Sequence, residues 1–215
     1  MKFLITAGGT REYIDPVRFI SNASSGKMGY ALAASAAKRG HDVTIISANV
    51  ALLVPEKTTV IKVQTAEEMF EAVKTKFADC DCLIMAAAVS DYTPVETREH
   101  KLKKGDGELV IKLKPTVDIL KWAGQVKSKN QKSKGKNKRQ VVVGFALEDE
   151  DIEKRAEKKL IEKNLDMIIA NTPSAIAADS AEVKIKTRNG NWLTLEPQDK
   201  TAIAEKIITL AEKLI

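Results

Sequence analysis

The sequence is poor in the residues that hold metals and disulfides. It contains two cysteines, Cys80 and Cys82, and two histidines, His41 and His100. Cys80 and Cys82 are one residue apart, so on a strand their side chains point to opposite faces and cannot easily pair or form a metal site by themselves. Two cysteines and two histidines are few metal ligands for a zinc enzyme, which is therefore disfavoured. We assign no residue to a metal site.

Membrane-length apolar runs are also missing. The runs CLIMAAAV and VVVGFA are far shorter than the roughly 20 apolar residues that cross a bilayer. The opening MKFLITAGG lacks the small-residue cleavage pattern of a signal peptide and reads as a first β-strand. With 215 residues, 44% of them apolar, the chain is long enough for one domain with a large core. We therefore expect a single cytoplasmic domain over residues 1–215.

The net charge of +6 suggests an anionic partner, but most of it has a local origin. Residues 127–139 (KSKNQKSKGKNKR) carry seven basic side chains and no acidic or apolar one, so the rest of the chain is near neutral, at −1. Nucleic-acid binding usually interleaves aromatic residues with the lysines, and none occurs here. We interpret this segment as a solvated, mobile loop and expect no nucleic-acid partner.

Short apolar runs alternate with longer helical patterns, which is typical of βαβ units around a parallel sheet. Thr65 and Glu68 form a capping-box pattern, and a hairpin over 181–196 has its turn near Asn189 and Gly190. A second mobile loop is expected at about 93–108. The fold class is a three-layer, Rossmann-like α/β fold, mostly parallel, with a small antiparallel addition near the C-terminus. We expect strands at 2–7, 42–47, 59–64, 82–92, 108–114, 140–148 and 165–171, and helices at 27–39, 65–77, 117–126, 150–164 and 199–214.

The fingerprint of a dinucleotide-binding domain is absent. GGTREYIDPVRF follows the first strand in place of G-x-G-x-x-G, and the second strand ends at Ser47-Ala48-Asn49 with no carboxylate to hold a ribose. An NAD(P)-dependent reductase is therefore disfavoured, although it remains the alternative function on this fold.

The glycines lie instead in SSGKMG, at the start of the first helix. Backbone N–H groups at a helix N-terminus, beside the hydroxyls of Ser24 and Ser25, form an anion site. Helix capping explains one serine, and close helix–sheet packing explains Gly26 and Gly29. Neither explains Asn22, both serines and Lys27 together, so we favour a binding function for this segment.

Ligands of such folds bind at the carboxyl ends of the strands. Asp91, in AAAVSDY, either faces a ligand or caps a turn, and Phe145 either stacks on a ring or belongs to the core. The loop lysines Lys101, Lys103 and Lys104 are either solvent-exposed or form a lid over a polyphosphate. Lys159 and Lys163 share a helix face, which by itself indicates an ordinary solvated surface.

Five sequence blocks follow one another along the chain: TAGGTREYIDPVRFISNASSGKMGYALA, AAAVSDY, KLKK, GFALE and KNLDMIIAN. Their order and spacing resemble those of phosphopantothenoylcysteine synthetase, a ligase of coenzyme A synthesis. In bacteria this enzyme is fused to a flavin-dependent decarboxylase or separate from it, and the chain is similar to the stand-alone form. The similarity covers residues 2–171, and only the basic loop at 127–139 departs from the family pattern.

The resemblance implies that 4′-phosphopantothenate and CTP give an acyl-cytidylate, which L-cysteine then captures, with Mg²⁺ accompanying the triphosphate. It implies a homodimer in which the segment from Arg18 to Asn22 lies near the partner's site. Asn22 and Lys101 are the implied catalytic residues. The implied nucleotide contacts are Met85, Ala86, Ala87, Asp91, Val117, Asp118, Ile119, Leu120, Phe145, Lys159 and Lys163, and the substrate-binding residues are Arg18, Asn22, Ser24, Ser25, Gly26 and Lys27.

Overall fold

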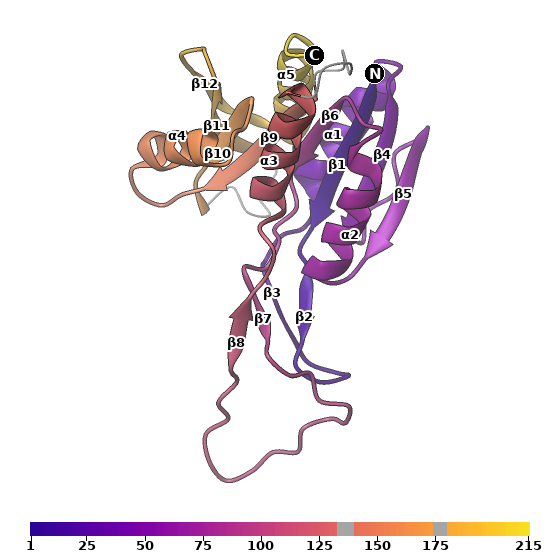
Figure 1. Cartoon of the computed structure of the whole chain (residues 1–215), viewed down its shortest axis with the longest axis vertical. Coiled ribbons are helices and arrows are strands. Elements are labelled where there is room, and N and C mark those ends of the chain that lie inside the picture. The colour runs from indigo at the N-terminus through magenta and orange to yellow at the C-terminus, as the bar shows by residue number, and fades with distance from the viewer. Residues whose placement is uncertain (133–139, 174–179) are drawn as a thin grey trace.

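The centre of the molecule is an eight-stranded sheet (Figure 1). It is seen in a computed structural model that describes residues 1–132, 140–173 and 180–215. Two antiparallel strands, β11 (Ser180–Thr187) and β12 (Trp192–Asp199), complete one edge of the sheet. The other six are parallel and lie in the spatial order β5 (Thr58–Val63), β4 (Asp42–Ala48), β1 (Lys2–Gly8), β6 (Cys82–Met85), β9 (Val141–Leu147) and β10 (Met167–Asn171).

When only the parallel strands are numbered along the chain, their spatial order is 3-2-1-4-5-6, which is the Rossmann order. The first of them, β1, pairs on one side with β4, where Leu4 lies opposite Thr44, and on the other side with β6, where Leu4 lies opposite Leu83. The strand order reverses between β1 and β6, which is where ligands bind in this architecture. The predicted fold class, including the antiparallel addition, is confirmed.

Helices cover both faces of the sheet and make three layers. Helices α1 (Lys27–Lys38) and α5 (Lys200–Glu212) pack on one face, and α2 (Ala66–Phe77), α3 (Ile119–Lys132) and α4 (Ile152–Glu162) on the other. Side chains of β1 alternate between the two cores, with Phe3 and Ile5 on the α1 side and Leu4 on the other. Because both faces are buried, the central strands read as continuous apolar runs.

The predicted cap of α2 is present with a shift of one residue. The Thr65 hydroxyl accepts a hydrogen bond from the Glu68 N–H at 3.1 Å, and the Glu68 carboxylate accepts one from the Gln64 N–H at 2.7 Å. The two bonds satisfy backbone donors at the start of the helix, which fixes where α2 begins.

The prediction of a loop starting at residue 127 is wrong, because α3 continues to Lys132. Lys127 is buried, and its Nζ donates to the Asp166 carboxylate at 2.7 Å. Asp166 also accepts from the Val142 N–H at 2.8 Å. This buried ion pair ties the last turns of α3 to the sheet, so the basic run begins as part of the helix. Residues 133–139 lie outside the described residues.

Two short strand pairs leave the body of the molecule as an arm, residues 11–21 and 92–115 (Figure 1). It contains β2 (Arg11–Tyr13), β3 (Phe19–Ser21), β7 (Tyr92–Pro94) and β8 (Leu113–Pro115). The predicted strand at 108–114 is wrong, because β8 is shorter and starts later. Its segment is exposed, and β7 offers a partner of only three residues.

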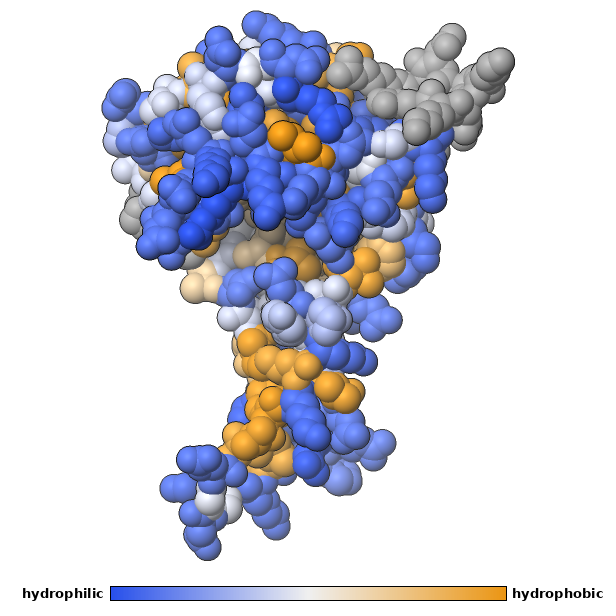
Figure 2. Space-filling model, turned by 60° about the vertical axis from the view of Figure 1, so that its left-hand side comes forward, coloured by the Kyte–Doolittle hydropathy of each residue, from blue (hydrophilic) through white to orange (hydrophobic). Residues whose placement is uncertain are grey.

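Exposed apolar side chains gather on the arm, where Figure 2 shows a patch of hydrophobic surface below the body. The arm's large exposed apolar residues are Val17, Phe19, Tyr92, Val95, Leu109, Val110 and Leu113. Monomeric soluble proteins rarely expose contiguous apolar surface of this kind without a partner for it.

Candidate active site

The floor of the site is formed where the chain leaves β1 and β6. Their extensions stay side by side, because Gly9 and Ala88 form a parallel bridge and the Ala88 N–H donates to the Gly8 carbonyl at 2.8 Å. The Thr10 hydroxyl then accepts from the Ser90 N–H at 2.9 Å. These contacts hold the segments after the two strands together at the switch point of the sheet.

One wall of the site is the segment from Asn22 to Met28, which leads into α1. The Asn22 side-chain amide lies against the segment that follows β6 and donates to the carbonyls of Ala88 and Val89 at 3.4 and 3.3 Å. Both distances are at the long end for hydrogen bonds, so a ligand oxygen can compete for this amide.

The entry to α1 is made by a glycine and not by a serine cap. The residue that caps the helix is Gly26, which has a φ of 77° and makes no side-chain cap. An added Cβ at Gly26 would lie 2.4 Å from the Val50 side chain. The Ser24 and Ser25 hydroxyls accept only long hydrogen bonds from the N–H groups of Gly26 and Lys27, at 3.4 and 3.5 Å, and both serines line the same cavity as Asn22.

The other side of the cleft holds a small cavity of about 150 Å³. It joins the loop after β6, the start of α3, the end of β9 and the last turn of α4. Ten of the eleven predicted nucleotide contacts line it: Met85, Ala87, Asp91, Val117, Asp118, Ile119, Leu120, Phe145, Lys159 and Lys163. The eleventh, Ala86, lines the adjoining wider cavity. Segments separated by up to 78 positions in the sequence thus meet in one place.

Two lysines and a carboxylate set the charge of this cavity. Asp118 pairs with Lys163 at 2.7 Å. Burial raises the pKa of Asp118, but the hydrogen bonds from Lys163 and the Lys121 N–H outweigh it and leave the pKa below its ordinary value. The Nζ of Lys159 donates to the Phe145 carbonyl at 2.8 Å.

The pKa of Lys159 lies below its ordinary value, first because of burial and then because of the nearby charge of Lys163. The carboxylates of Glu148, Asp118 and Asp91 oppose this shift. A phosphate placed between the two lysines would relieve their repulsion, so the cavity is suited to an anionic ligand.

The wider cavity, of about 460 Å³, includes Asn22, Ser24, Ser25, Gly26 and Lys27 as well as Asp91, Phe145 and Lys159. Its volume is within the usual range for small-molecule sites. Sequence reasoning missed several of its residues, namely Leu147, Asn171, Ala181, Val183 and Lys200. Asn171 could have been found, because it ends β10 and ligands bind at the carboxyl ends of parallel strands. Nothing in the sequence indicates that Lys200 lines the same cavity as Asn22.

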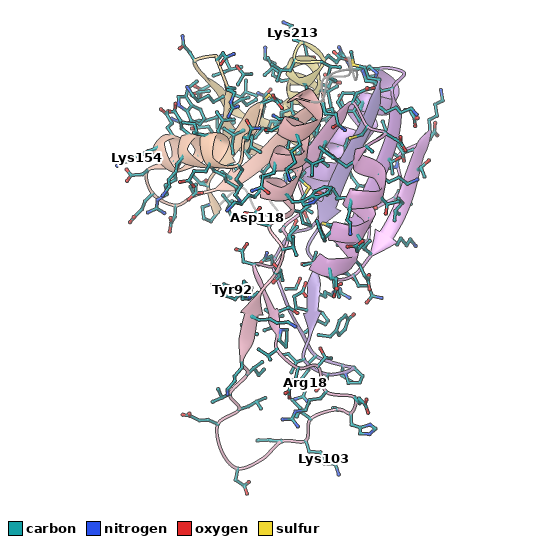
Figure 3. All side chains as sticks on the ribbon, viewed as in Figure 1. Arg18, Tyr92, Lys103, Asp118, Lys154 and Lys213 are labelled. Carbon is teal, nitrogen blue, oxygen red and sulfur yellow. The ribbon has the colours of Figure 1, made fainter. Side chains whose placement is uncertain are left out.

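Two predicted site residues lie elsewhere in this structure. Arg18 is on the arm, where its guanidinium pairs with Asp15 at 2.8 Å and donates to the Leu102 carbonyl. Lys101 directly precedes Leu102 and is exposed. Figure 3 shows Lys103 near Arg18 toward the free end of the arm, well away from Asp118. The lysine segment therefore lies along the arm and does not cover the cavities of its own chain.

Residues 1–214 match the family described as the DNA/pantothenate metabolism flavoprotein C-terminal domain. The chain belongs to this family. It is 44% identical, over 210 residues, to the coenzyme A biosynthesis bifunctional protein CoaBC of Bacillus subtilis, a match that covers 95% of this chain and 49% of that protein. The chain thus spans about half the length of the curated relatives it matches. These findings confirm the family resemblance of the sequence blocks.

Solved structures agree with the family assignment. The crystal structure of the C-terminal domain of a CoaBC protein is 37% identical and superposes with a TM-score of 0.82, covering 99% of this chain and 94% of that one. The DNA/pantothenate metabolism flavoprotein of Streptococcus pneumoniae is 26% identical with a TM-score of 0.84, and all of both chains is covered.

Among the described residues, no group of three or more His, Cys, Asp or Glu side chains is placed to hold a metal ion. In the same part of the chain, no helix is both long and apolar enough to span a membrane.

Proposed function

We propose that this chain is a phosphopantothenate–cysteine ligase that activates 4′-phosphopantothenate with CTP and joins it to L-cysteine. The observation that supports this most is the meeting of the Asn22–Lys27 wall and the Asp91, Phe145 and Lys159 cavity in one cleft. The family's relatives include proteins named for coenzyme A biosynthesis. No feature of the cleft specifically favours the reductase alternative.

In the first step, a carboxylate oxygen of phosphopantothenate attacks the α-phosphorus of CTP, and pyrophosphate leaves. The free carboxylate is a poor electrophile because its charge is delocalised, whereas the mixed anhydride carries a good leaving group. The nucleotide occupies the small cavity, with Phe145 beside the base or ribose and the Lys159–Lys163 pair near the phosphates. The Lys101 ammonium group offsets the negative charge of the triphosphate, which builds up on the leaving pyrophosphate during this step.

In the second step, the amine of cysteine attacks the acyl carbon, an amide forms and CMP leaves. The Asn22 amide N–H donates to the acyl oxygen as negative charge develops there. The weak hydrogen bonds of this amide to Ala88 and Val89 leave it available for that role. Ser24, Ser25, Gly26 and Lys27 provide hydroxyl, backbone and ammonium donors for the phosphopantothenate, and Arg18 joins them from the arm of a second copy of the chain.

Mg²⁺ enters this scheme with the triphosphate. Because the described residues contain no cluster of three metal-binding side chains, we assign most of its ligands to phosphate oxygens and water, as is usual for nucleotide-bound Mg²⁺. The ion would offset the charge of the β- and γ-phosphates, while Lys159 and Lys163 hold the phosphate nearest the ribose.

A homodimer paired through the apolar arm explains how Lys101 can reach a triphosphate although it lies on the arm. In its own chain this lysine directly precedes Leu102, whose carbonyl accepts from Arg18 on the arm. Figure 3 shows Lys103, two residues further on, well away from Asp118. A second copy that covers the exposed side chains of Phe19, Tyr92 and Val110 would bring its arm to the first copy's cleft, so that Lys101 acts on the partner's triphosphate.

Complementation tests this arrangement. Asn22→Ala and Lys101→Gln variants, each slow in the overall ligation when alone, regain activity when mixed dimers form, because one of the two sites then has both residues intact. Mixed dimers that form but stay inactive contradict the exchange of Lys101 between chains.

Pyrophosphate release tests the ligase proposal itself. The chain is incubated with CTP, ATP, GTP or UTP, with and without 4′-phosphopantothenate. Release that requires phosphopantothenate and is fastest with CTP supports the proposal. Release without phosphopantothenate, or none with any triphosphate, contradicts it.

A further inference from the structure

The Asp15 carboxylate is fully buried within the arm. Its Oδ1 accepts hydrogen bonds from the N–H groups of Val17 and Arg18, each at 2.8 Å, and so closes the turn of the β2–β3 hairpin. Its Oδ2 accepts from the Arg18 Nε at 2.9 Å and from the Leu102 N–H at 3.1 Å. A buried charge is retained only where donors satisfy it, and here four of them do.

The second oxygen of Asp15 therefore reaches a residue 87 positions away in the sequence. Both backbone polar groups of Leu102 are fixed, because its N–H donates to Asp15 and its carbonyl accepts from the Arg18 guanidinium. Asp15 and Arg18 thus act on one backbone residue as a paired clamp. We call the segment 96–112 that contains this residue the lysine loop.

Other contacts attach the lysine loop to the same hairpin. The Arg98 N–H donates to the Ile14 carbonyl at 2.9 Å, and the Thr97 hydroxyl donates to the Tyr13 carbonyl at 3.0 Å. These bonds hold the loop up to residue 98. Beyond residue 98, the Leu102 clamp fixes the loop to the hairpin. A backbone hydrogen bond from the Val95 N–H to the Lys112 carbonyl, at 2.9 Å, closes the base of the loop.

The hairpin in turn is anchored to the body of the molecule. The Arg11 N–H donates to the Gln64 carbonyl at 2.8 Å, and the buried Glu12 carboxylate accepts from the Ala66 N–H at 2.9 Å. The Tyr13 hydroxyl donates to Gln64 Oε1 at 2.7 Å. A continuous set of bonds therefore runs from the start of α2, through the hairpin, to Leu102.

The residues on both sides of Leu102 are lysines. Leu102 is half-buried, whereas Lys101 and Lys103 are exposed. Long lysine side chains lose much conformational entropy when they bind a phosphate, and fixing their backbone beforehand reduces that cost. The clamp therefore holds two cations at a defined place on the arm.

We propose that Asp15 is a positioning residue for the activation step, since its carboxylate fixes the Leu102 backbone and thereby holds Lys101 and Lys103 where they meet the triphosphate. The role of Lys101 in this statement rests on the proposed function, whereas the clamp itself does not. Backbone donors and Arg18 outweigh the effect of burial and lower the pKa of Asp15 to about 2, so the carboxylate stays charged at every pH at which an enzyme of this kind is assayed.

Asp15→Asn is the variant that separates the clamp from the turn. The asparagine keeps an oxygen to accept from the Val17 and Arg18 N–H groups, but its NH₂ group faces the Leu102 N–H and the Arg18 Nε–H, which are donors. Asp106→Asn is the matched control, because it makes the same chemical change at an exposed position of the same loop.

The first readout is hydrogen–deuterium exchange of the full chain, which does not depend on activity. We expect peptides covering 98–104 to exchange about tenfold faster in Asp15→Asn, as expected for the loss of hydrogen bonds to a charged group, and to be unchanged in Asp106→Asn. Exchange that is equal in the two variants overturns the clamp. If Asp15→Asn does not fold, Arg18→Gln must show the same local increase, and its failure to do so has the same consequence.

The second readout is pyrophosphate release in a double-mutant cycle with Lys101→Gln. If Asp15 acts through Lys101, Asp15→Asn lowers kcat/KM for CTP about tenfold in the wild type, but has less than about a twofold effect when Lys101 is already Gln. Equal losses in both backgrounds overturn the positioning role. If wild-type protein releases no pyrophosphate, the proposed function fails, while the exchange result still decides whether the clamp exists.

Discussion

Gly124 links the packing of α3 to the geometry of the nucleotide cavity. A Cβ added at this position would lie 1.9 Å from the Lys163 carbonyl oxygen and 3.0 Å from the Lys163 carbonyl carbon. Ordinary contacts begin near 3.4 Å, so the two backbones would have to separate by about 1.5 Å. The obstacle is main chain, which cannot rotate away as a flexible side chain can.

Two opposed contributions decide whether Gly124→Ala raises or lowers the free energy of unfolding. Alanine favours a helix over glycine by about 1 kcal/mol, whereas overpacking costs about 1–3 kcal/mol. Because the clash is with a carbonyl, we expect the upper end of that range and a net destabilisation of about 2 kcal/mol. For a chain of this size each kcal/mol lowers Tm by about 2–4 °C, which gives a fall of about 4–8 °C.

The same displacement reaches the site. Asp118 directly precedes α3 and Lys163 directly follows α4, and their side chains are paired at 2.7 Å. Moving α3 away from the end of α4 would therefore pull this ion pair apart. We expect the KM for CTP to rise about tenfold, within the hundredfold loss that a misplacement of 1 Å can cause.

Thermal unfolding and pyrophosphate release against CTP concentration measure the two effects of Gly124→Ala. Gly107→Ala is the control, because an added Cβ there meets no atom within 4 Å. A Gly124→Ala protein with wild-type Tm and wild-type KM refutes the reasoning.

Four further changes test separate parts of the account. Asn22→Ala should still release pyrophosphate but accumulate the acyl-cytidylate, since losing such a donor costs about a hundredfold or more; normal turnover excludes the assignment. Lys101→Gln should slow pyrophosphate release at least about tenfold, and an unchanged rate excludes its role. The folded-state pKa of Asp15 is depressed to about 2 from 3.8, so its stabilisation is present above pH 3.8 and is lost as the pH falls toward 2. Urea unfolding at pH 5, 4 and 3 should therefore show a smaller acid loss for Asp15→Asn than for wild type, and equal losses contradict the shift. Lys127→Met leaves the Asp166 carboxylate buried without its 2.7 Å partner, which should lower the free energy of unfolding by about 3–5 kcal/mol; a change below 1 kcal/mol in urea unfolding contradicts the buried pair.

The parts of the site that follow strands could be predicted from the sequence. Asp91 and Phe145 belong to segments that end buried apolar runs, and the topology of parallel sheets brings such ends to one edge. Asp118 and Lys163 meet there because α3 and α4 pack on the same face of the sheet. The family resemblance added their roles, which periodicity alone did not indicate.

The parts that depend on distant partners could not be predicted in this way. Lys127 belongs to a run of lysines that is typical of a solvated loop, and its burial depends on Asp166, 39 positions later. The sequence around Asp15 is that of an ordinary turn, and its bond to Leu102 spans 87 positions. The arm was missed for a similar reason, since β7 and β8 are three residues each and their pairing is non-local.

The central claim is that this protein activates a carboxylate by transferring a nucleotide to it. The most direct test uses 4′-phosphopantothenate labelled with ¹⁸O in both carboxylate oxygens, with CTP and L-cysteine, and mass spectrometry of the products. The account predicts one ¹⁸O atom in the phosphate of CMP and one in the new amide. Label found in inorganic phosphate together with CDP, or CMP that carries no label, would contradict it.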